Sequence, residues 1–338
     1  MKNIKNILNS LILVITLGLL INNASAQDLR YSQSFANPLK LNPSIMGANP
    51  DFKLMLDYRK QWAAIGNGYT TYSFTSLFPI FMKEGKEKLD IGVGVDNDKA
   101  GAFGKMDMSL ALGYNLKMSD AGNLSFSLLG SYVQKSINFD ELSFDDQYVN
   151  GAYIASNANT ETTLNQKIGY SDVGFGLMWY YNPSSDRGKL NAYLGVSGFH
   201  MNSPNESFTG GTATLAKKYC YQGGIKILGA NKIDFTPNIR VTSQNGSQEI
   251  ASGLYMDYRF SDKAKLVLGG WFRRNDAMAF AVGFDMKSFT LGYSYDVITS
   301  DISKVVTGTN AHEVTLSYKI NRAEKKNIKF NNSPFHNF

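Results

Sequence analysis

Few of the side chains that usually perform catalysis are present in this chain of 338 residues. It has three histidines, His200, His312 and His336, and a single cysteine, Cys220. Hydrolases that use a serine pair it with a histidine and a third, orienting residue, and the chain has no G-x-S-x-G motif to supply such a serine. A lone cysteine also cannot form a disulfide within the chain. We therefore expect no catalytic residue and no cofactor.

Two further patterns could suggest a ligand site, but both are better explained as parts of strands. His312 and Glu313 are neighbours, and neighbouring side chains of a strand point to opposite faces, so this pair cannot chelate one metal ion. Gly92 and Gly94 lie in a glycine-rich stretch that no helix follows, which excludes a phosphate-binding loop. We expect no structural metal.

The first 26 residues have the pattern of a cleaved secretory signal peptide. Lys2 and Lys5 precede an apolar run from Ile7 to Ile21, and the sequence Ala24-Ser25-Ala26 follows it. Cleavage is expected after Ala26. An uncleaved membrane anchor is the alternative, but the apolar run is short and ends in a cleavage pattern. No later run is long enough for a membrane helix.

The net charge of +6 does not indicate a nucleic-acid-binding protein. Lys2 and Lys5 leave with the signal peptide, and residues 321–338 carry four basic residues against one acidic residue. The rest of the chain is almost neutral. We interpret residues 321–338 as a basic tail that is either solvated or docks a partner.

Apolar residues alternate with small or polar residues in many segments, which is typical of strands with two different faces. In the segment from Leu110 to Met118, for example, Leu112, Tyr114 and Leu116 alternate with Ala111, Gly113 and Asn115. About fourteen such segments are present. They lie near 53–62, 68–79, 88–96, 105–118, 123–136, 168–181, 189–201, 218–228, 231–242, 249–260, 264–273, 277–286, 288–297 and 312–320.

This pattern predicts an all-β fold, a transmembrane antiparallel up-and-down β-barrel over residues 53–320 with its apolar face toward lipid. The three longest connections, 137–167, 202–217 and 298–311, follow odd-numbered strands, as expected if they are extracellular and the N-terminus is periplasmic. Aromatic residues near segment ends are interpreted as interfacial girdles. They are Trp62, Tyr69, Trp179 to Tyr181, Tyr255, Tyr258 and Trp271.

The sequence resembles the PorP/SprF family in several motifs that occur in order from Gln27 to Ile320. The opening after residue 26 is similar to that of the family. The later matches are Tyr58 to Trp62 (Y-R-x-Q-W), Asn97 to Gly101 (N-D-x-A-G), Tyr132 to Gln134, Asp145 to Gln147, His200 to Phe208 (H-x-N-x-P-x-x-S-F) and Gly292 to Asp296 (G-Y-S-Y-D). The tail at 321–338 departs from the family pattern.

The resemblance implies a non-catalytic outer-membrane component of the type IX secretion system, which exports surface proteins and gliding adhesins. It also implies partners: a periplasmic PorK/PorN-type ring, a PorE-type periplasmic protein, and a secreted surface protein with a type B C-terminal domain. Outer-membrane lipid would surround the barrel. No nucleic acid is expected as a partner.

Loops held on a rigid scaffold are common binding sites, so we expect the loops at 97–104, 137–167, 202–217 and 298–311 to form a cup for cargo. The candidate contact residues are Asp98, Phe103, Asp145, Asp146, Tyr148, Asn205 and Phe208. Each could equally be an ordinary loop-packing residue. Residues 27–52 are a candidate periplasmic strap or lumen plug.

A passive porin or channel without secretion partners is the alternative function, because a barrel of this size can enclose either an open channel or a plugged lumen.

Overall fold

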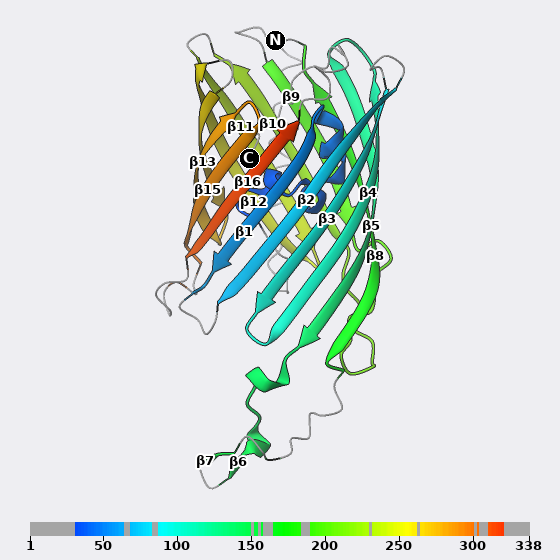
Figure 1. Ribbon diagram of the computed structural model, residues 1–338, viewed down its shortest axis with the longest axis vertical. Coiled ribbons are helices and arrows are strands. Elements are labelled where there is room, and N and C mark those ends of the chain that lie inside the picture. Colours follow the sequence, from blue (N-terminus) through cyan, green and yellow to red (C-terminus); the bar gives the residue numbers. More distant parts are fainter. Residues whose placement is uncertain are drawn as a thin grey trace, which may run out of the picture.

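The computed structural model describes residues 31–63, 68–82, 87–149, 152–154, 157, 165–183, 190–229, 232–261, 264–300, 303 and 310–320. Fourteen strands form one closed antiparallel barrel, and β6 and β7 form a separate two-stranded sheet (Figure 1). The barrel strands are β1 (Phe52–Gln61), β2 (Tyr69–Met82), β3 (Glu87–Ala100), β4 (Phe103–Lys117), β5 (Gly122–Ile137), β8 (Lys167–Tyr181), β9 (Leu190–Phe199), β10 (Lys218–Leu228), β11 (Ile233–Gln244), β12 (Ser247–Ser261), β13 (Ala264–Arg273), β14 (Ala277–Met286), β15 (Phe289–Ile298) and β16 (Ala311–Ile320). The separate strands are β6 (Tyr148–Val149) and β7 (Ala152–Tyr153).

The predicted up-and-down barrel of about fourteen strands is confirmed. Each barrel strand pairs with the barrel strands before and after it in sequence, and β1 closes the sheet by pairing with β16. In this closing ladder Phe52 lies opposite Ile320, and Gln61 lies opposite Ala311. Closure satisfies the backbone of the first and last strands, which would otherwise be exposed edges.

The two faces of the strands separate apolar from polar residues, as the alternation predicted. Leu112 on β4 and Leu128 on β5 point outward and are 58% and 66% exposed. Asp257 on β12 and Glu313 on β16 point inward and are fully buried. An apolar exterior around a polar interior is the arrangement of a barrel embedded in lipid.

The interpretation of three aromatic residues as girdle residues is wrong. Tyr180, Tyr255 and Trp271 point into the lumen and are 2%, 0% and 7% exposed. The outward neighbours of Tyr255 and Trp271 are Leu254 and Phe272, so the strand alternation, and not the distance from the strand end, decides which way an aromatic ring faces. Trp179 and Tyr181 do face outward, with their rings stacked at 6.2 Å.

The long connections gather at one end of the barrel, called here the loop end, and the opposite end is called the turn end. The connections after β5, β9 and β15 lie at the loop end, and the segment that contains β6 and β7 projects well beyond the barrel there (Figure 1). Residues 97–104 were expected to form a loop, but they form the tips of β3 and β4. Gly101 has a φ of 58°, which allows Gly101 and Ala102 alone to connect the two strands.

Residues 31–49 lie inside the barrel and are called the lumen segment. It contains three short helices, which pass from the loop end to the turn end before β1 begins (Figure 1). They are η1 (Ser34–Ala36), α2 (Pro38–Leu41) and η2 (Pro43–Ala48). Nearly every residue of the lumen segment is buried. None of the helices in the described part of the chain has the length and hydropathy needed to cross a membrane.

The predicted signal peptide at 1–26 and the basic tail at 321–338 lie outside the described residues, as does most of the connection at 298–311.

Replacing Leu112 by Arg should destabilise the barrel by about 2–4 kcal/mol, because the charge would lie in the middle of the lipid-facing surface. The matched control is Met118→Arg, on the same apolar face but at the turn end of β4, where the cost should be about 0–1 kcal/mol. Guanidinium unfolding in lipid vesicles measures both values. Equal costs at the two positions would contradict the placement of the lipid-facing surface.

Candidate functional site

A buried ionic network fastens the start of the lumen segment to the loop end of the barrel. The Arg59 guanidinium lies 2.9 Å from the Asp296 carboxylate and 2.8 Å from the Glu313 carboxylate. Glu313 in turn accepts hydrogen bonds from the backbone N–H groups of Ser32 and Gln33, at 2.8 and 2.7 Å. The network therefore joins the lumen segment to β1, β15 and β16.

A second arginine adds another positive charge to this network. Arg273 on β13 donates to Asp296 at 2.8 Å and to Asp276 at 2.9 Å. The Ser32 hydroxyl donates to Asp296 at 2.6 Å and accepts from Arg59 at 2.6 Å. Buried charges are tolerated only when they are paired and hydrogen-bonded, so the network depends on all of these partners at once.

The other end of the lumen segment is held by its backbone carbonyl groups. Lys88 on β3 donates to the carbonyl oxygen of Met46 at 3.0 Å. Asn115 on β4 and Tyr180 on β8 both donate to the carbonyl oxygen of Gly47, at 3.0 and 2.6 Å. The Met46 carbonyl oxygen also accepts from the Asn49 backbone N–H at 3.0 Å, so the wall side chains add to the hydrogen bonds that end η2.

The middle of the lumen segment fits a notch in the barrel wall. The Asn42 side chain donates to the carbonyl oxygens of Leu177 on β8 and Val196 on β9, at 3.2 and 3.3 Å. A Cβ atom on Gly176 would lie only 2.3 Å from the Asn42 oxygen. Glycine is therefore required for this close approach of the wall to the segment.

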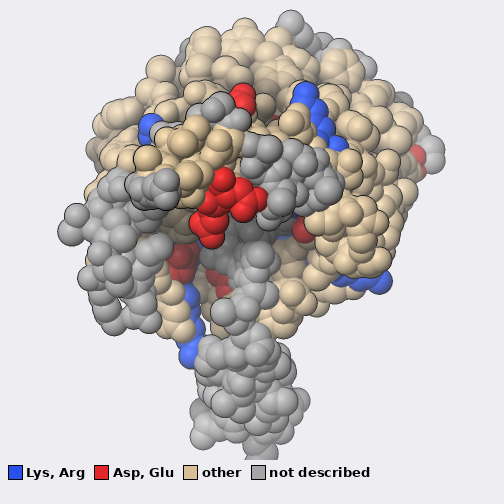
Figure 2. Space-filling view, turned by 90° about the horizontal axis from the view of Figure 1, so that it is seen from below, with Lys and Arg blue, Asp and Glu red and all other residues tan. Residues whose placement is uncertain are grey.

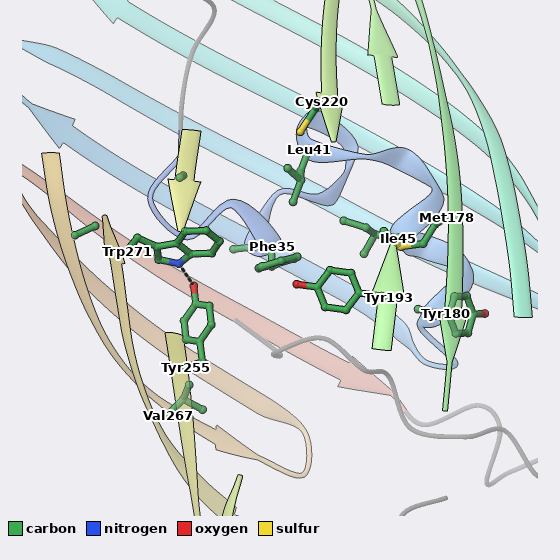
Figure 3. Close-up of a cluster of buried hydrophobic side chains, with 14 residues drawn as sticks. Phe35, Leu41, Ile45, Met178, Tyr180, Tyr193, Cys220, Tyr255, Val267 and Trp271 are labelled. Atoms are coloured by element: carbon green, nitrogen blue, oxygen red, sulfur yellow. Dashed lines mark hydrogen bonds between the residues drawn. The ribbon is translucent and has the colours of Figure 1, made fainter. Parts of the chain in front are cut away.

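Apolar side chains of the lumen segment complete a core that crosses the lumen (Figure 3). Phe35 contacts the ring of Tyr193 on β9 edge to face, with centroids 6.3 Å apart. Trp271 donates from its indole nitrogen to the Tyr255 hydroxyl at 2.8 Å. Burial of one large side chain such as Phe35 contributes about 1.5–3 kcal/mol. The lumen segment is therefore packed against the wall as a protein core and is not a loose strap.

A pocket with many ionisable side chains in its lining opens between the lumen segment and the loop end. It offers about 40 Å³ of space for the centres of water-sized molecules, enough for about two or three waters. Its ionisable lining combines four aspartates, three lysines and one histidine with Tyr31. They are Asp96, Asp98, Asp107, Asp172, Lys40, Lys105, Lys218 and His200. We call this space the vestibule pocket.

Most of the charges around the vestibule pocket are paired. The Lys40 ammonium group lies 3.4 Å from Asp96 and 2.7 Å from Asp107. Burial alone would lower the pKa of Lys40, but the two carboxylates outweigh it and raise this pKa, so Lys40 stays protonated. His200 Nδ1 lies 2.7 Å from the Asp172 carboxylate.

Residues 138–149 and 152–154 form a projecting lobe with exposed aromatic and acidic side chains. Tyr148 and Tyr153 pair across β6 and β7, with ring centroids 5.4 Å apart, and are 54% and 46% exposed. Figure 2, seen from below, shows acidic side chains gathered near the middle of the loop end. The acidic residues of the lobe are Asp140, Glu141, Asp145 and Asp146. The lobe therefore presents aromatic rings and negative charge together.

Three connections at the loop end are tied to one another. Lys99 near the tip of β3 pairs with Glu141 of the lobe at 2.9 Å. Lys135 near the end of β5 pairs with Glu206, which belongs to the connection between β9 and β10. The Asn165 N–H donates to the carbonyl oxygen of Phe208 at 2.8 Å. The loop end is thus one connected surface.

The structure places the predicted contact residues in three environments. Asp98 faces inward, accepts a hydrogen bond from Thr71 at 2.6 Å and lines the vestibule pocket. Phe103 is 52% exposed at the start of β4. Asp145, Asp146 and Tyr148 lie together on the lobe, outside the pocket.

The other two predicted residues lie in the connection between β9 and β10. The Asn205 side chain is used within that loop, where it donates to Gly211 and accepts from Ser207 and Ala213. Phe208 is half-buried. Asn205 therefore shapes its loop, while the lobe residues are directed toward solvent.

Sequence reasoning did not identify the inward-facing charges of the vestibule pocket. Asp107, Asp172 and Lys218 all lie on inward positions near the loop end of their strands. The strand alternation could have indicated that these three side chains face inward, because each of them occupies the polar face of a strand whose other face is apolar. Tyr31 and Lys40 belong to the lumen segment, and nothing in the strand pattern indicates their contacts.

Replacing Asp296 by Asn should lower the free energy of unfolding by about 3–5 kcal/mol, because two buried guanidinium groups would lose a shared carboxylate. The control is Asp120→Asn at the turn end. This residue pairs with Lys117 in an exposed salt bridge that should contribute no more than about 1 kcal/mol. Guanidinium unfolding measures both. An Asp296 variant as stable as the Asp120 variant would show that the network does not hold the segment.

The fold of the chain is similar to solved outer-membrane channels. The Ralstonia pickettii toluene transporter TbuX matches with a TM-score of 0.53 and 10% identity, over 83% of this chain and 92% of that chain. The Pseudomonas putida toluene transporter TodX matches with a TM-score of 0.51 and 10% identity, over 88% and 95%. At this identity the likeness shows the barrel fold alone. A comparison with curated proteins gave no match.

The family comparison is more specific. Residues 23–318 match the family described as "Type IX secretion system membrane protein PorP/SprF". This range contains the lumen segment and nearly all of the barrel, and it agrees with the resemblance of the sequence motifs. The chain therefore belongs to the PorP/SprF family and is an outer-membrane β-barrel of the type IX secretion system.

Proposed function

We propose that this barrel binds a secreted surface protein or gliding adhesin, with a type B C-terminal domain, at its loop end and helps to secrete or retain it there. In this proposal the loop end is extracellular, because outer-membrane barrels have short periplasmic turns and longer external loops. The turn end would contact the PorK/PorN-type ring and the PorE-type protein. The role is binding and is not catalytic.

The observation that carries the proposal is the projecting lobe. It extends beyond the barrel (Figure 1). Its tyrosine rings and its carboxylates are exposed. Tyrosines on a scaffolded surface are frequent anchors of protein interfaces, since they bury a large area at a small entropic cost. The ion pairs to Lys99 and Lys135 fix the neighbouring loops around the base of the lobe.

The packed lumen segment favours this function over a passive porin. It contacts strands on all sides of the barrel, from Lys88 on β3 to Tyr180 on β8, Tyr193 on β9 and Glu313 on β16. An open channel would need that space for water and solute. The similar fold of hydrocarbon channels does not decide the point, because one fold supports many functions.

The direct test is mass spectrometry of a tagged copy purified from gently solubilised outer membranes, compared with a mock-tagged control. Recovery of ring components or of one dominant surface protein would support the secretion function. Recovery of the barrel alone would contradict it.

Replacing Tyr148 by Ala should reduce recovery of the surface protein at least about tenfold, the effect of losing one interface anchor. Tyr148→Phe keeps the ring and should recover most of the binding. Phe280→Ala truncates an equally exposed aromatic residue on the lipid-facing wall and serves as the matched control. If the Tyr148 and Phe280 variants recover equal amounts of the surface protein, the lobe is not the contact surface.

A chain that lacks residues 31–49 should conduct ions in a planar bilayer, whereas the complete protein should conduct little. Barrel closure depends on the pairing of β1 with β16, which the deletion leaves intact. Heat-modifiable migration on a gel confirms that the variant folds. High conductance of the complete protein would favour the porin alternative.

A second variant checks the position of the lumen segment without deleting it. The Ser44 and Ser127 hydroxyl oxygens lie 2.8 Å apart, so cysteines at both positions should form a disulfide on oxidation. Failure to form this bond in the membrane would contradict the seated position of η2.

A further inference from the structure

A group of polar side chains borders the apolar outer wall at the seam where β1 meets β16, two strands that lie side by side (Figure 1). Lys60 on β1 lies opposite His312 on β16, near the loop end. Both side chains face outward, because Arg59 and Glu313, their neighbours along the strands, are buried in the lumen. We call this group the seam patch, and its members are Tyr58, Lys60, Tyr72, Tyr293, Tyr295 and His312.

Two tyrosines hold the imidazole ring of His312 in place. The Tyr293 hydroxyl and His312 Nδ1 lie 2.8 Å apart, and the centroids of the Tyr295 and His312 rings lie 5.0 Å apart. Asn310 donates to the Tyr295 hydroxyl at 2.5 Å, which fixes that ring in turn. With Nδ1 accepting from Tyr293, the imidazole carries its hydrogen on Nε2. Nε2 has no partner among the described residues, so it is available as a donor on the exposed side of the ring.

The Lys60 ammonium group has no carboxylate or other hydrogen-bond partner in the part of the chain that the structure describes. By contrast, Lys99 on the outer face of β3 pairs with Glu141. Beside Lys60, the exposed rings of Tyr58 and Tyr72 lie 5.2 Å apart. The seam patch therefore carries positive charge and tyrosine hydroxyl groups, and none of its members is acidic.

The position of the seam patch on the wall places it at the border of the hydrocarbon layer. Toward the middle of the wall, the outward residues of the same two strands are apolar, namely Leu56, Val314 and Leu316. Tyrosines gather at the level of lipid headgroups, and a lysine at a membrane interface extends its ammonium group toward them. The patch is therefore continuous with the lipid-contacting surface and lies at the depth of the headgroups, whose negative charges are phosphates.

We propose that the seam patch binds the phosphate group of an anionic lipid headgroup, with the acyl chains of that lipid against the apolar wall beside the patch. Lys60 supplies the positive charge, and His312 Nε2 and the hydroxyl groups of Tyr58 and Tyr72 donate to the phosphate oxygens. With the loop end external, as proposed above, this lipid belongs to the outer leaflet. The binding itself rests neither on that orientation nor on the secreted protein.

The experiment measures lipid binding to the purified full chain in detergent by native mass spectrometry. The probe is dioleoyl phosphatidate, which has an exposed phosphate group. The matched probes are dioleoylglycerol, which lacks the phosphate, and dioleoylphosphatidylcholine, whose phosphate is balanced by choline. Phosphatidate should bind at least about fivefold more tightly than either, the effect of one lysine near an anionic lipid surface. Equal binding of either neutral lipid would overturn the proposal.

Replacing Lys60 by Gln should weaken phosphatidate binding about fivefold, and Lys60→Gln together with His312→Gln should weaken it further. Lys167→Gln is the matched control, because it removes one positive charge from an exposed residue at the loop end of β8 and should change nothing. Heat-modifiable migration on a gel confirms that each variant folds. If the Lys60 and Lys167 variants bind phosphatidate equally well, Lys60 only extends toward water and the proposal fails.

Inorganic phosphate separates a lipid site from a site for the free ion. Excess inorganic phosphate should leave phosphatidate bound, because burial of the acyl chains contributes to the affinity of the lipid. Displacement of the lipid by inorganic phosphate would contradict a lipid as the occupant. No secreted protein enters these experiments, so their result is independent of the purification of partners.

Discussion

The rest of the structure depends on how charges inside the barrel are neutralised away from bulk water. Inward positions of the strands carry arginines, lysines and carboxylates, and a buried charge is tolerated only with a partner and with hydrogen bonds. The lumen segment supplies part of what the wall lacks. The N–H groups of Ser32 and Gln33 complete the bonds of Glu313, and Lys40 neutralises Asp96 and Asp107. The barrel wall and the lumen segment therefore neutralise each other's charges and together form the interior.

This constraint explains why the lumen is packed while the exterior is uniformly apolar. A barrel that conducted water could leave its inner charges solvated. Here the segment brings Phe35 and Ile45 into the same space, where they pack with wall residues such as Tyr255 and Met178 (Figure 3). Apolar packing and ion pairing hold the segment at different depths, the ion pairs at the loop end and the apolar core in the middle. Displacing the segment would therefore break both at once.

The barrel could be predicted from the sequence because its determinants are local. Apolar and polar residues alternate along a strand such as β4 because one face contacts lipid and the other faces a polar lumen. The lengths of the connections indicate which end carries the loops. The lumen segment could not be placed in this way, because its helices are short and its contacts join residues far apart, such as Ser32 and Glu313. The predicted strand ended at residue 96, and the N-D-x-A-G motif that follows was expected to be a loop, but pairing with β4 extends β3 to Ala100.

The candidate site shows the same division between features that local sequence predicts and features that depend on distant contacts. Asp145, Asp146 and Tyr148 could be selected from the sequence because a long connection between two strands has to lie outside the barrel. The vestibule pocket has no such signal, since Asp172 and Asp107 come from β8 and β4, on either side of β5, and line the pocket together with residues of the lumen segment. Sequence reasoning therefore identifies the exposed surface of the loop end. The pocket beneath it could not be identified in this way, because its lining comes from several strands and from Tyr31 and Lys40 of the lumen segment.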